Sequence, residues 1–184
     1  MSNLNQVLQA LQQDGVIAYP TEAVFGLGCD PDSEIAVKAL LKIKQRPVEK
    51  GLILVAANYN QLLPYVDDQA IPKKMRQQIL ASWPGHVSWV LPASDAAPAW
   101  ITGKFDSIAV RVSAHPVVQQ LCLAFGKPIV STSANLSGQP AITDAQLLVE
   151  QLSQHLSAIM PGDLGGAEQP SQIRNALTGA IVRS

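Results

Sequence analysis

Four small polar side chains occur within residues 131–135 (STSAN), directly after the apolar run 128–130 (PIV). Ser, Thr and Asn hydrogen-bond to their own backbone and are common in turns, so an ordinary loop is one interpretation. The other is a polar cradle for a ligand, because open α/β sheets bind ligands at the carboxyl ends of their strands. This segment alone leaves both interpretations open.

Positive charge is concentrated in one short part of the chain. Five of the thirteen Lys and Arg residues lie within thirteen positions: Lys38, Lys42, Lys44, Arg46 and Lys50. A helix end attracts basic side chains, which accounts for Lys42 and Lys44. Arg46 and Lys50 lie beyond the helix end that Pro47 predicts. Cations fixed in this way suit a triphosphate, to which Arg offers a planar fork and Lys a point charge.

Residues 19–28 (YPTEAVFGLG) predict a sharply bent backbone whose glycines allow a ligand to approach closely. The segment has neither the GxGxxG pattern nor a Walker lysine. A plain turn and a contact to a nucleotide or amino acid are equally compatible with it. Its one carboxylate, Glu22, is expected to be a solvated side chain, and a general base is the alternative.

Arg111 lies in the middle of a strand pattern, residues 107–112 (SIAVRV), and points away from the apolar positions on either side. Ligand binding, a buried ion pair and an exposed strand face are all compatible with this placement. Residues 170–171 (PS) form an ordinary turn signal in isolation. The three histidines share no spacing, so none is assigned to catalysis.

Helical and strand-like patterns alternate along the chain. Helices are predicted near residues 4–11, from a cap at Asp30 or Asp32 through Leu41, and near 72–82, 116–125 and 143–156. Strands are predicted at 16–19, 52–56, 87–91, 108–112, 129–132, 158–160 and 180–182, the last joined to 176–177 as a hairpin. This alternation predicts a single α/β domain over residues 1–184, with helices packed on a mixed sheet.

The composition excludes several classes of protein. A net charge of −1 disfavours nonspecific coating of nucleic acid. The longest apolar run, near residues 87–91, is far shorter than the roughly 20 residues of a membrane helix. The first fifteen residues lack the pattern of a secretory signal, so a cytoplasmic protein is expected. Cys29 and Cys122 have no metal or disulfide spacing and are expected to be inert core thiols, with no protein-built metal site.

Several short motifs together resemble the YrdC-like family. They are residues 19–22 with 26–28 (YPTE, GLG), 44–47 (KQRP), 83–85 (WPG), 110–112 (VRV), 131–135 (STSAN) and 170–171 (PS). Each is weak alone, but their order and spacing match over nearly the whole chain. The resemblance implies a twisted mixed α/β sheet around a large basic concave cavity. It also implies that L-threonine, bicarbonate and ATP react to L-threonylcarbamoyladenylate and pyrophosphate, towards N6-threonylcarbamoyladenosine in tRNA.

Site residues follow from the resemblance by motif position. It implies that threonine or its carbamate is held by Thr21, Arg111, Ser131 and Ser171. It implies that ATP is held by Lys44, Arg46, Lys50, Ser133, Asn135 and Arg183, of which Lys44 and Arg46 are the catalytic pair. Two positions depart from the family pattern: Ala23 stands where Thr is frequent, and His86 where Pro is frequent.

The resemblance further implies Mg²⁺ that arrives with ATP, and transfer of the adenylate to the TsaD, TsaB and TsaE proteins. It leaves tRNA or double-stranded RNA open as a further partner, and no membrane partner is expected. The alternative function is a noncatalytic RNA-binding or ribosome-maturation module. Weak overall charge and the lack of aromatic clusters for base stacking count against it. A hydrogenase-maturation enzyme is disfavoured because zinc-finger motifs are missing.

Overall fold

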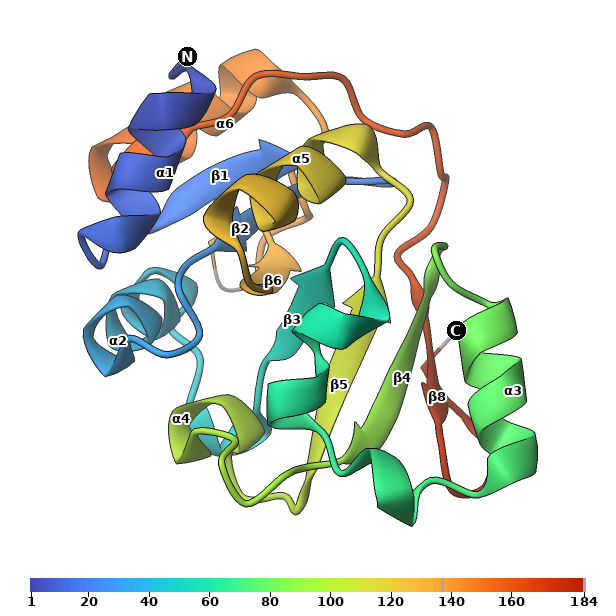
Figure 1. The fold of residues 1–184 in the computed structure, drawn as a ribbon. Helices are drawn as coiled ribbons and strands as arrows, with labels where there is room; N and C mark the ends of the chain where they lie inside the picture. Colours follow the sequence, from blue (N-terminus) through green and yellow to red (C-terminus); the bar gives the residue numbers. More distant parts are fainter. Residues whose placement is uncertain (137, 184) are drawn as a thin grey trace.

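The structure is a computed structural model that describes residues 1–136 and 138–183. Its strands are β1 (Ile17–Pro20), β2 (Phe25–Gly28), β3 (Ile53–Ala56), β4 (Val87–Pro92), β5 (Ser107–Val112), β6 (Ile129–Ser133), β7 (Ala158–Ile159), β8 (Gln172–Asn175) and β9 (Ile181–Arg183). They form a nine-stranded sheet in the order β7-β1-β2-β6-β3-β5-β4-β8-β9. Pairing is parallel for β1–β7, β3–β5 and β4–β8 and antiparallel elsewhere, so the sheet is mixed. The strand direction turns strongly from β1 to β4 (Figure 1).

The α-helices are α1 (Leu4–Gln12), α2 (Glu34–Lys44), α3 (Lys73–Ala81), α4 (Ala99–Thr102), α5 (Pro116–Phe125) and α6 (Ala145–Leu152). The short 3-10 helices are η1 (Val48–Lys50), η2 (Tyr59–Gln61), η3 (Leu63–Tyr65), η4 (Asp68–Ala70) and η5 (Ser153–His155). Local sequence sets several helix starts: Asn3 and Gln6 form a capping box on α1, and Ser33 caps α2. Within the described residues, no helix has the length and apolar character needed to cross a membrane.

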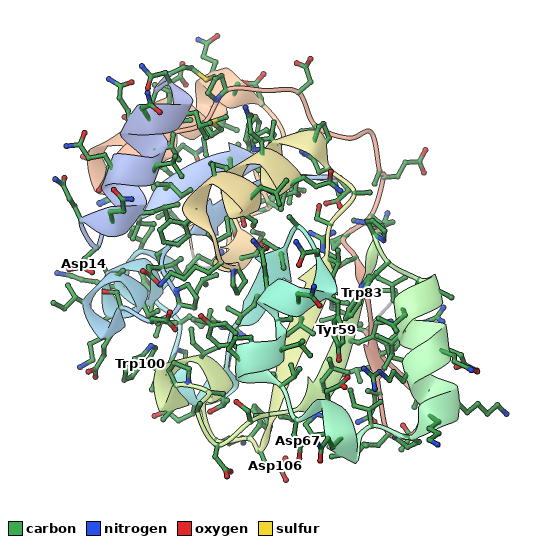
Figure 2. All side chains as sticks on the ribbon, in the orientation of Figure 1. Asp14, Tyr59, Asp67, Trp83, Trp100 and Asp106 are labelled. Carbon is green, nitrogen blue, oxygen red and sulfur yellow. The ribbon has the colours of Figure 1, made fainter. Side chains whose placement is uncertain are left out.

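Two apolar cores lie on opposite faces of the sheet, because successive strand residues point to opposite sides. Leu54 and Val130 pack in the first core, with buried residues of α2, α3, α4 and α6. Val55 and Ile129, one position along each strand, pack in the second core with α1 and α5. The side chains fill the space between these layers (Figure 2).

The strand register places polar residues on the face that carries the second core. Val55 lies opposite Arg111, and Ile53 lies opposite Ser131. Gly26 lies opposite Ser133 on the next strand pair. Helices α1 and α5 cover only part of this face, and the cavity described below is lined by its uncovered residues.

The predicted mixed α/β sheet is confirmed, but the strands β2 and β8, the helix α4 and the 3-10 helices η1 to η4 were not expected from the sequence. The predicted hairpin is displaced, because residues 172–175 rather than 176–177 pair with β9. The cap of α2 is Ser33, not Asp30 or Asp32. Asp32 instead accepts hydrogen bonds from the Tyr65 hydroxyl at 2.8 Å and from Lys127 at 2.8 Å.

Candidate functional site

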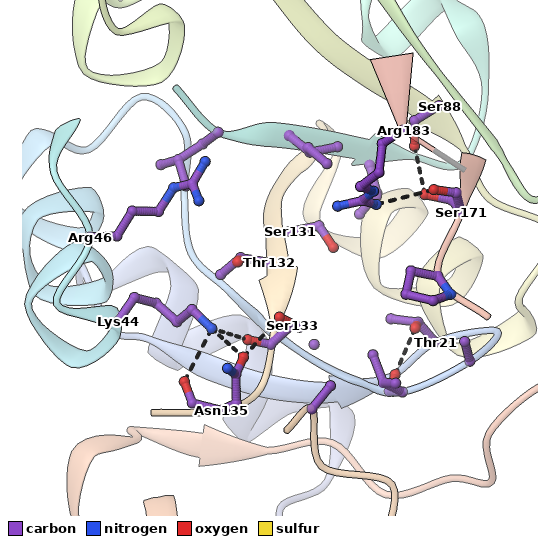
Figure 3. A pocket seen from close by; sticks show the side chains of 18 of the residues that line it. Thr21, Lys44, Arg46, Ser88, Ser131, Thr132, Ser133, Asn135, Ser171 and Arg183 are labelled. Carbon is purple, nitrogen blue, oxygen red and sulfur yellow. Dashed lines mark hydrogen bonds between the residues drawn. The ribbon is translucent and has the colours of Figure 1, made fainter. Parts of the chain in front are cut away.

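A cavity of about 420 Å³ opens beside β2, β3 and β6. All ten site residues that the family resemblance implies lie on its wall: Thr21, Lys44, Arg46, Lys50, Arg111, Ser131, Ser133, Asn135, Ser171 and Arg183. Figure 3 shows Lys44 and Arg46 on one side of the cavity, and Thr21, Ser171 and Arg183 on the other. Ser131 and Thr132 lie between the two groups (Figure 3).

The wall of the cavity is strongly positive. Five of its residues are cationic, and none of the described residues that line it is Asp or Glu. The chain as a whole carries a net charge of −1, so this excess of cations is local. All but Arg111 of these five cations form no ion pair among the described residues, so they create a positive potential that attracts anions.

Lys44, the last residue of α2, is buried with its ammonium group inside the cavity. Its Nζ donates to the Ser133 carbonyl at 2.7 Å, to the Asn135 carbonyl at 3.1 Å and to Asn135 Oδ1. These three acceptors are neutral, so they hold the ammonium without cancelling its charge. Burial, and to a smaller degree the charge of Arg46, lowers the pKa of Lys44 to about 8.

Arg46 lies just beyond α2, because Gln45 ends the helix in a left-handed conformation. Its Nη2 donates to the Gly51 carbonyl at 3.0 Å. Its Nε is buried and has no hydrogen-bond partner among the described residues. A buried donor without a partner costs about 1–3 kcal/mol, which favours an oxygen of a bound ligand at this position.

The polar segment begins inside β6: residues 131–133 belong to the strand, and Asn135 follows it. Ser133 Oγ donates to Asn135 Oδ1 at 2.8 Å, and Asn135 Nδ2 donates to the Gln139 carbonyl at 2.7 Å. The side chain of Asn135 is thereby held facing Lys44 (Figure 3). The interpretation as an ordinary loop is therefore wrong for residues 131–133, and all four polar residues of the segment lie on the cavity wall.

Glu22 was expected to be solvated, and this prediction is wrong. The residue is 9% exposed, and its carboxylate accepts from Arg111 Nη1 at 2.9 Å and from Ser113 Oγ at 2.7 Å. Burial alone would raise its pKa, but Arg111 and the Ser113 hydroxyl outweigh burial and lower it. Glu22 is therefore the buried counterion of Arg111.

Hydroxyl groups and Arg183 complete the side of the cavity opposite Lys44. Thr21 Oγ1 donates to the Val24 carbonyl at 2.6 Å, which fixes its position after β1. Ser171 Oγ lies 2.9 Å from Ser88 Oγ, and Arg183 Nη2 donates to the Ser171 carbonyl at 3.1 Å. Arg183 is exposed as a residue, but partial desolvation of its guanidinium, and then the charges of Arg111 and Arg46, lower its pKa. Arg183 therefore lies within electrostatic reach of both.

Ser88 and His86 are among the wall residues that received no role from the sequence. The motif at 83–85 was the available signal, because His86 follows it directly and Ser88 lies in β4, the next strand. Among the described residues, no group of three His, Cys, Asp or Glu side chains is arranged to hold a metal ion. Cys29 and Cys122 are buried, and burial raises both thiol pKa values, as an inert core role predicts.

The fold and this cavity define a mixed α/β protein with a cationic site on one face of its sheet. The family model Sua5_yciO_yrdC, described as telomere recombination, matches residues 9–184, and the chain belongs to this family. A Yersinia enterocolitica protein named threonylcarbamoyl-AMP synthase is 61% identical over 180 residues, which cover 98% of this chain and 94% of that protein. A Vibrio campbellii protein of the same name is 55% identical and covers 100% of this chain and 99% of its own.

Solved structures share the fold. P. abyssi Sua5 complexed with L-threonine superposes with a TM-score of 0.86 at 31% identity, over 94% of this chain and 50% of that chain. This chain therefore spans about half the length of that protein. E. coli YciO superposes with a TM-score of 0.80 at 25% identity, over 98% of this chain and 88% of that chain.

Proposed function

We propose that this protein forms L-threonylcarbamoyladenylate and pyrophosphate from L-threonine, bicarbonate and ATP. The observation that carries the proposal is one cavity whose wall, among the described residues, holds five cationic side chains and no carboxylate. Two reacting partners that are both anionic must meet in one site, and fixed cations reduce their repulsion. The names of the full-length relatives support the same reaction.

The two sides of the cavity suit the two substrates. Lys44, Arg46 and Lys50, with Ser133 and Asn135, would hold the triphosphate of ATP. Thr21, Arg111, Ser131 and Ser171 would hold threonine, with Arg111 on its carboxylate. Arg183 lies within electrostatic reach of both Arg46 and Arg111, so it suits the point where the phosphates meet the carbamate.

The chemistry requires no nucleophile from the protein. The threonine amine adds to the carbon of bicarbonate and water leaves, which gives a carbamate. A carbamate oxygen then attacks the α-phosphorus of ATP, and the bond to the β-phosphate oxygen breaks to release pyrophosphate. Lys44, Arg46 and Arg183 would stabilise the charge that develops on the phosphates. Mg²⁺ enters as part of the Mg·ATP substrate.

Pyrophosphate release is expected to require threonine and bicarbonate together, because the attacking oxygen belongs to their adduct. Serine should react more slowly, by a factor that corresponds to about 1–3 kcal/mol for one missing methyl group. The measurement is pyrophosphate release by purified protein, with each substrate omitted in turn. Equal release without threonine would contradict the proposal, and binding of RNA without any turnover would favour the noncatalytic alternative.

ATP affinity is expected to fall as the pH rises through about 8, because the pKa of Lys44 is lowered to about 8 in the free protein. Above that pH the Lys44 amine is mostly neutral in the free protein. Anionic ATP binds the ammonium form, so the amine must take up a proton from solution when ATP binds. Calorimetric titration near pH 8.5, in two buffers of different ionisation enthalpy, measures that proton. Lys44→Arg, whose charge does not titrate in this range, is the control. Wild-type affinity that is unchanged from pH 7 to pH 9 would refute this role of Lys44.

Arg183→Ala is expected to weaken ATP binding by about 1.5–3 kcal/mol, the usual cost of a lost hydrogen bond to a charged group. Threonine binding and the melting temperature should change little, because the contact of Arg183 within the protein is to a backbone carbonyl at the sheet edge. Calorimetric titration with ATP and a melting curve test both statements. An unchanged dissociation constant for ATP would remove Arg183 from the site.

In this proposal the adenylate passes to the TsaD, TsaB and TsaE proteins, which use it on tRNA. The reaction itself needs no RNA, so tRNA or double-stranded RNA would act as a partner in transfer rather than as a substrate. Action in the cytoplasm and a single domain over residues 1–184 belong to the same proposal.

A further inference from the structure

His86 connects two parts of the cavity wall. It lies directly before β4, in a turn that three contacts stabilise. Trp83 Nε1 donates to the Val87 carbonyl at 2.7 Å, and the Gly85 amide donates to the Val112 carbonyl at 2.9 Å. The Trp83 ring also packs beside Tyr59, with ring centroids 5.9 Å apart (Figure 2). The backbone beneath His86 is therefore fixed.

The contacts of the imidazole determine which nitrogen carries its proton. His86 Nδ1 lies 3.0 Å from Arg111 Nη1, and a guanidinium nitrogen can only donate. Nδ1 must therefore be the unprotonated acceptor. His86 Nε2 lies 2.8 Å from the Gln169 carbonyl, which can only accept, so Nε2 carries the hydrogen. Both contacts are satisfied by one neutral form of the ring.

This arrangement leaves one edge of Arg111 for a ligand. Nη1 carries two hydrogens, one directed to Glu22 Oε2 at 2.9 Å and the other to His86 Nδ1. Nε of Arg111 is buried and has no partner among the described residues. A carboxylate binds a guanidinium through two parallel hydrogen bonds, and the edge formed by Nε and Nη2 is the one not occupied by Glu22 and His86.

The other contact of His86 restrains the segment that leads into β8. This segment also hydrogen-bonds to the turn after β1, through the amides of Gly165 and Ala167 to the carbonyls of Thr21 and Glu22, at 3.0 and 2.8 Å. Residue Gln169 lies two positions before Ser171, whose hydroxyl faces Ser88. One imidazole thus links Arg111 to the segment that positions Ser171.

We propose that His86 is a positioning residue for threonine: it fixes Arg111 so that the Nε–Nη2 edge faces the substrate carboxylate, and it holds the segment before Ser171. The proposal rests on the proposed function, since it assigns the carboxylate to threonine. It concerns orientation only, and His86 takes no part in proton transfer.

Two amide substitutions separate the two contacts. In His86→Asn, the amide oxygen replaces Nδ1 as the acceptor for Arg111, and the contact to Gln169 is lost. In His86→Gln, the amide nitrogen replaces Nε2 as the donor to Gln169, and the acceptor for Arg111 is lost. His86→Ala removes both contacts. His155→Gln, an exposed histidine on η5 away from the cavity, is the matched control.

The expected result is a rise in the threonine KM of about three- to tenfold in His86→Ala and His86→Gln, because the lost hydrogen bond acts on threonine only through the orientation of Arg111. The ATP KM should stay unchanged. His86→Asn keeps the hydrogen bond to Arg111 and loses only the contact to the segment before Ser171, so its threonine KM should rise less, to within about twofold of wild type. A threonine KM unchanged in His86→Ala, or raised equally in His86→Asn and His86→Gln, would overturn the proposal. Melting curves of all variants identify any loss of folding.

A nitrogen-15 spectrum of the histidine rings tests the tautomer independently of activity. The expected spectrum shows His86 protonated at Nε2 and unprotonated at Nδ1, and a hydrogen on Nδ1 would overturn the proposal. If wild-type protein releases no pyrophosphate with threonine, the proposed function fails. The tautomer, and its response to titration with L-threonine, would then decide the role of His86 by themselves: no response refutes it, and a shift at Nδ1 supports it.

Discussion

Arg46→Lys is expected to reduce kcat/KM for ATP by roughly ten- to one-hundred-fold although the charge is kept, which corresponds to about 1.5–3 kcal/mol. The guanidinium uses Nη2 to hold the Gly51 carbonyl, while its buried Nε has no partner among the described residues. A lysine cannot make both contacts, because it ends in one point charge. Steady-state rates of pyrophosphate release at varied ATP concentration measure the loss.

Lys42→Ala is the matched control for this substitution. Lys42 lies in the last turn of the same helix, is exposed and does not line the cavity. Its removal should change the free energy of unfolding by less than about 1 kcal/mol and leave turnover unaltered. If Arg46→Lys keeps wild-type kinetics, Arg46 is only a solvated side chain at a helix end, and its proposed role in binding the triphosphate is refuted.

Glu22→Gln is expected to destabilise the protein by about 3–5 kcal/mol, because it leaves the buried charge of Arg111 without its counterion. The melting temperature should fall by roughly 10 °C for a chain of this size. Thermal denaturation followed by circular dichroism measures the change. Glu34→Gln removes an exposed partner of Lys38 and is the control, with an expected change below about 0.5 kcal/mol.

The Glu22 pair also predicts a dependence on pH. The pKa of Glu22 in the folded state lies below its value in the unfolded chain, which is about 4.3. The ion pair therefore adds to the free energy of unfolding at any pH above the unfolded value. The contribution is lost as the pH falls through the folded-state pKa. The difference in stability between wild type and Glu22→Gln should therefore be largest near neutral pH and shrink in acid. A difference that stays constant down to acid denaturation would contradict the ion pair.

Elements with a clear hydrophobic period could be predicted from the sequence, and short elements shaped by tertiary contacts could not. Strand β2 is built from Phe25–Gly28, whose two glycines resemble a loop signal. A Cβ at Gly28 would lie 2.6 Å from the Val130 carbonyl and 2.8 Å from the Tyr19 ring, so glycine is required by close packing between strands rather than by a turn. Residue spacing does not distinguish these causes.

The candidate site shows the same division. Its cations and hydroxyls were predicted from the family resemblance, and the structure brings all ten of these residues to one cavity. The environment of Glu22 could not be predicted, since its partner Arg111 lies far along the chain, on strand β5. The sequence gives the chemical type of each side chain but not its burial. Burial decides whether a carboxylate is solvated or paired with a cation. His86 was overlooked for the same reason.

Two pairs of parallel strands join parts of the chain that are distant in sequence: β7 beside β1, and β8 beside β4. Such pairs raise the contact order, and the entropy of closing a long loop is lost before any contact forms. The cavity needs Thr21 from the first quarter of the chain and Arg183 from its last strand. Helices such as α1 make their backbone hydrogen bonds between residues close in sequence. We therefore expect ligand affinity to appear late in folding, once these distant segments have paired.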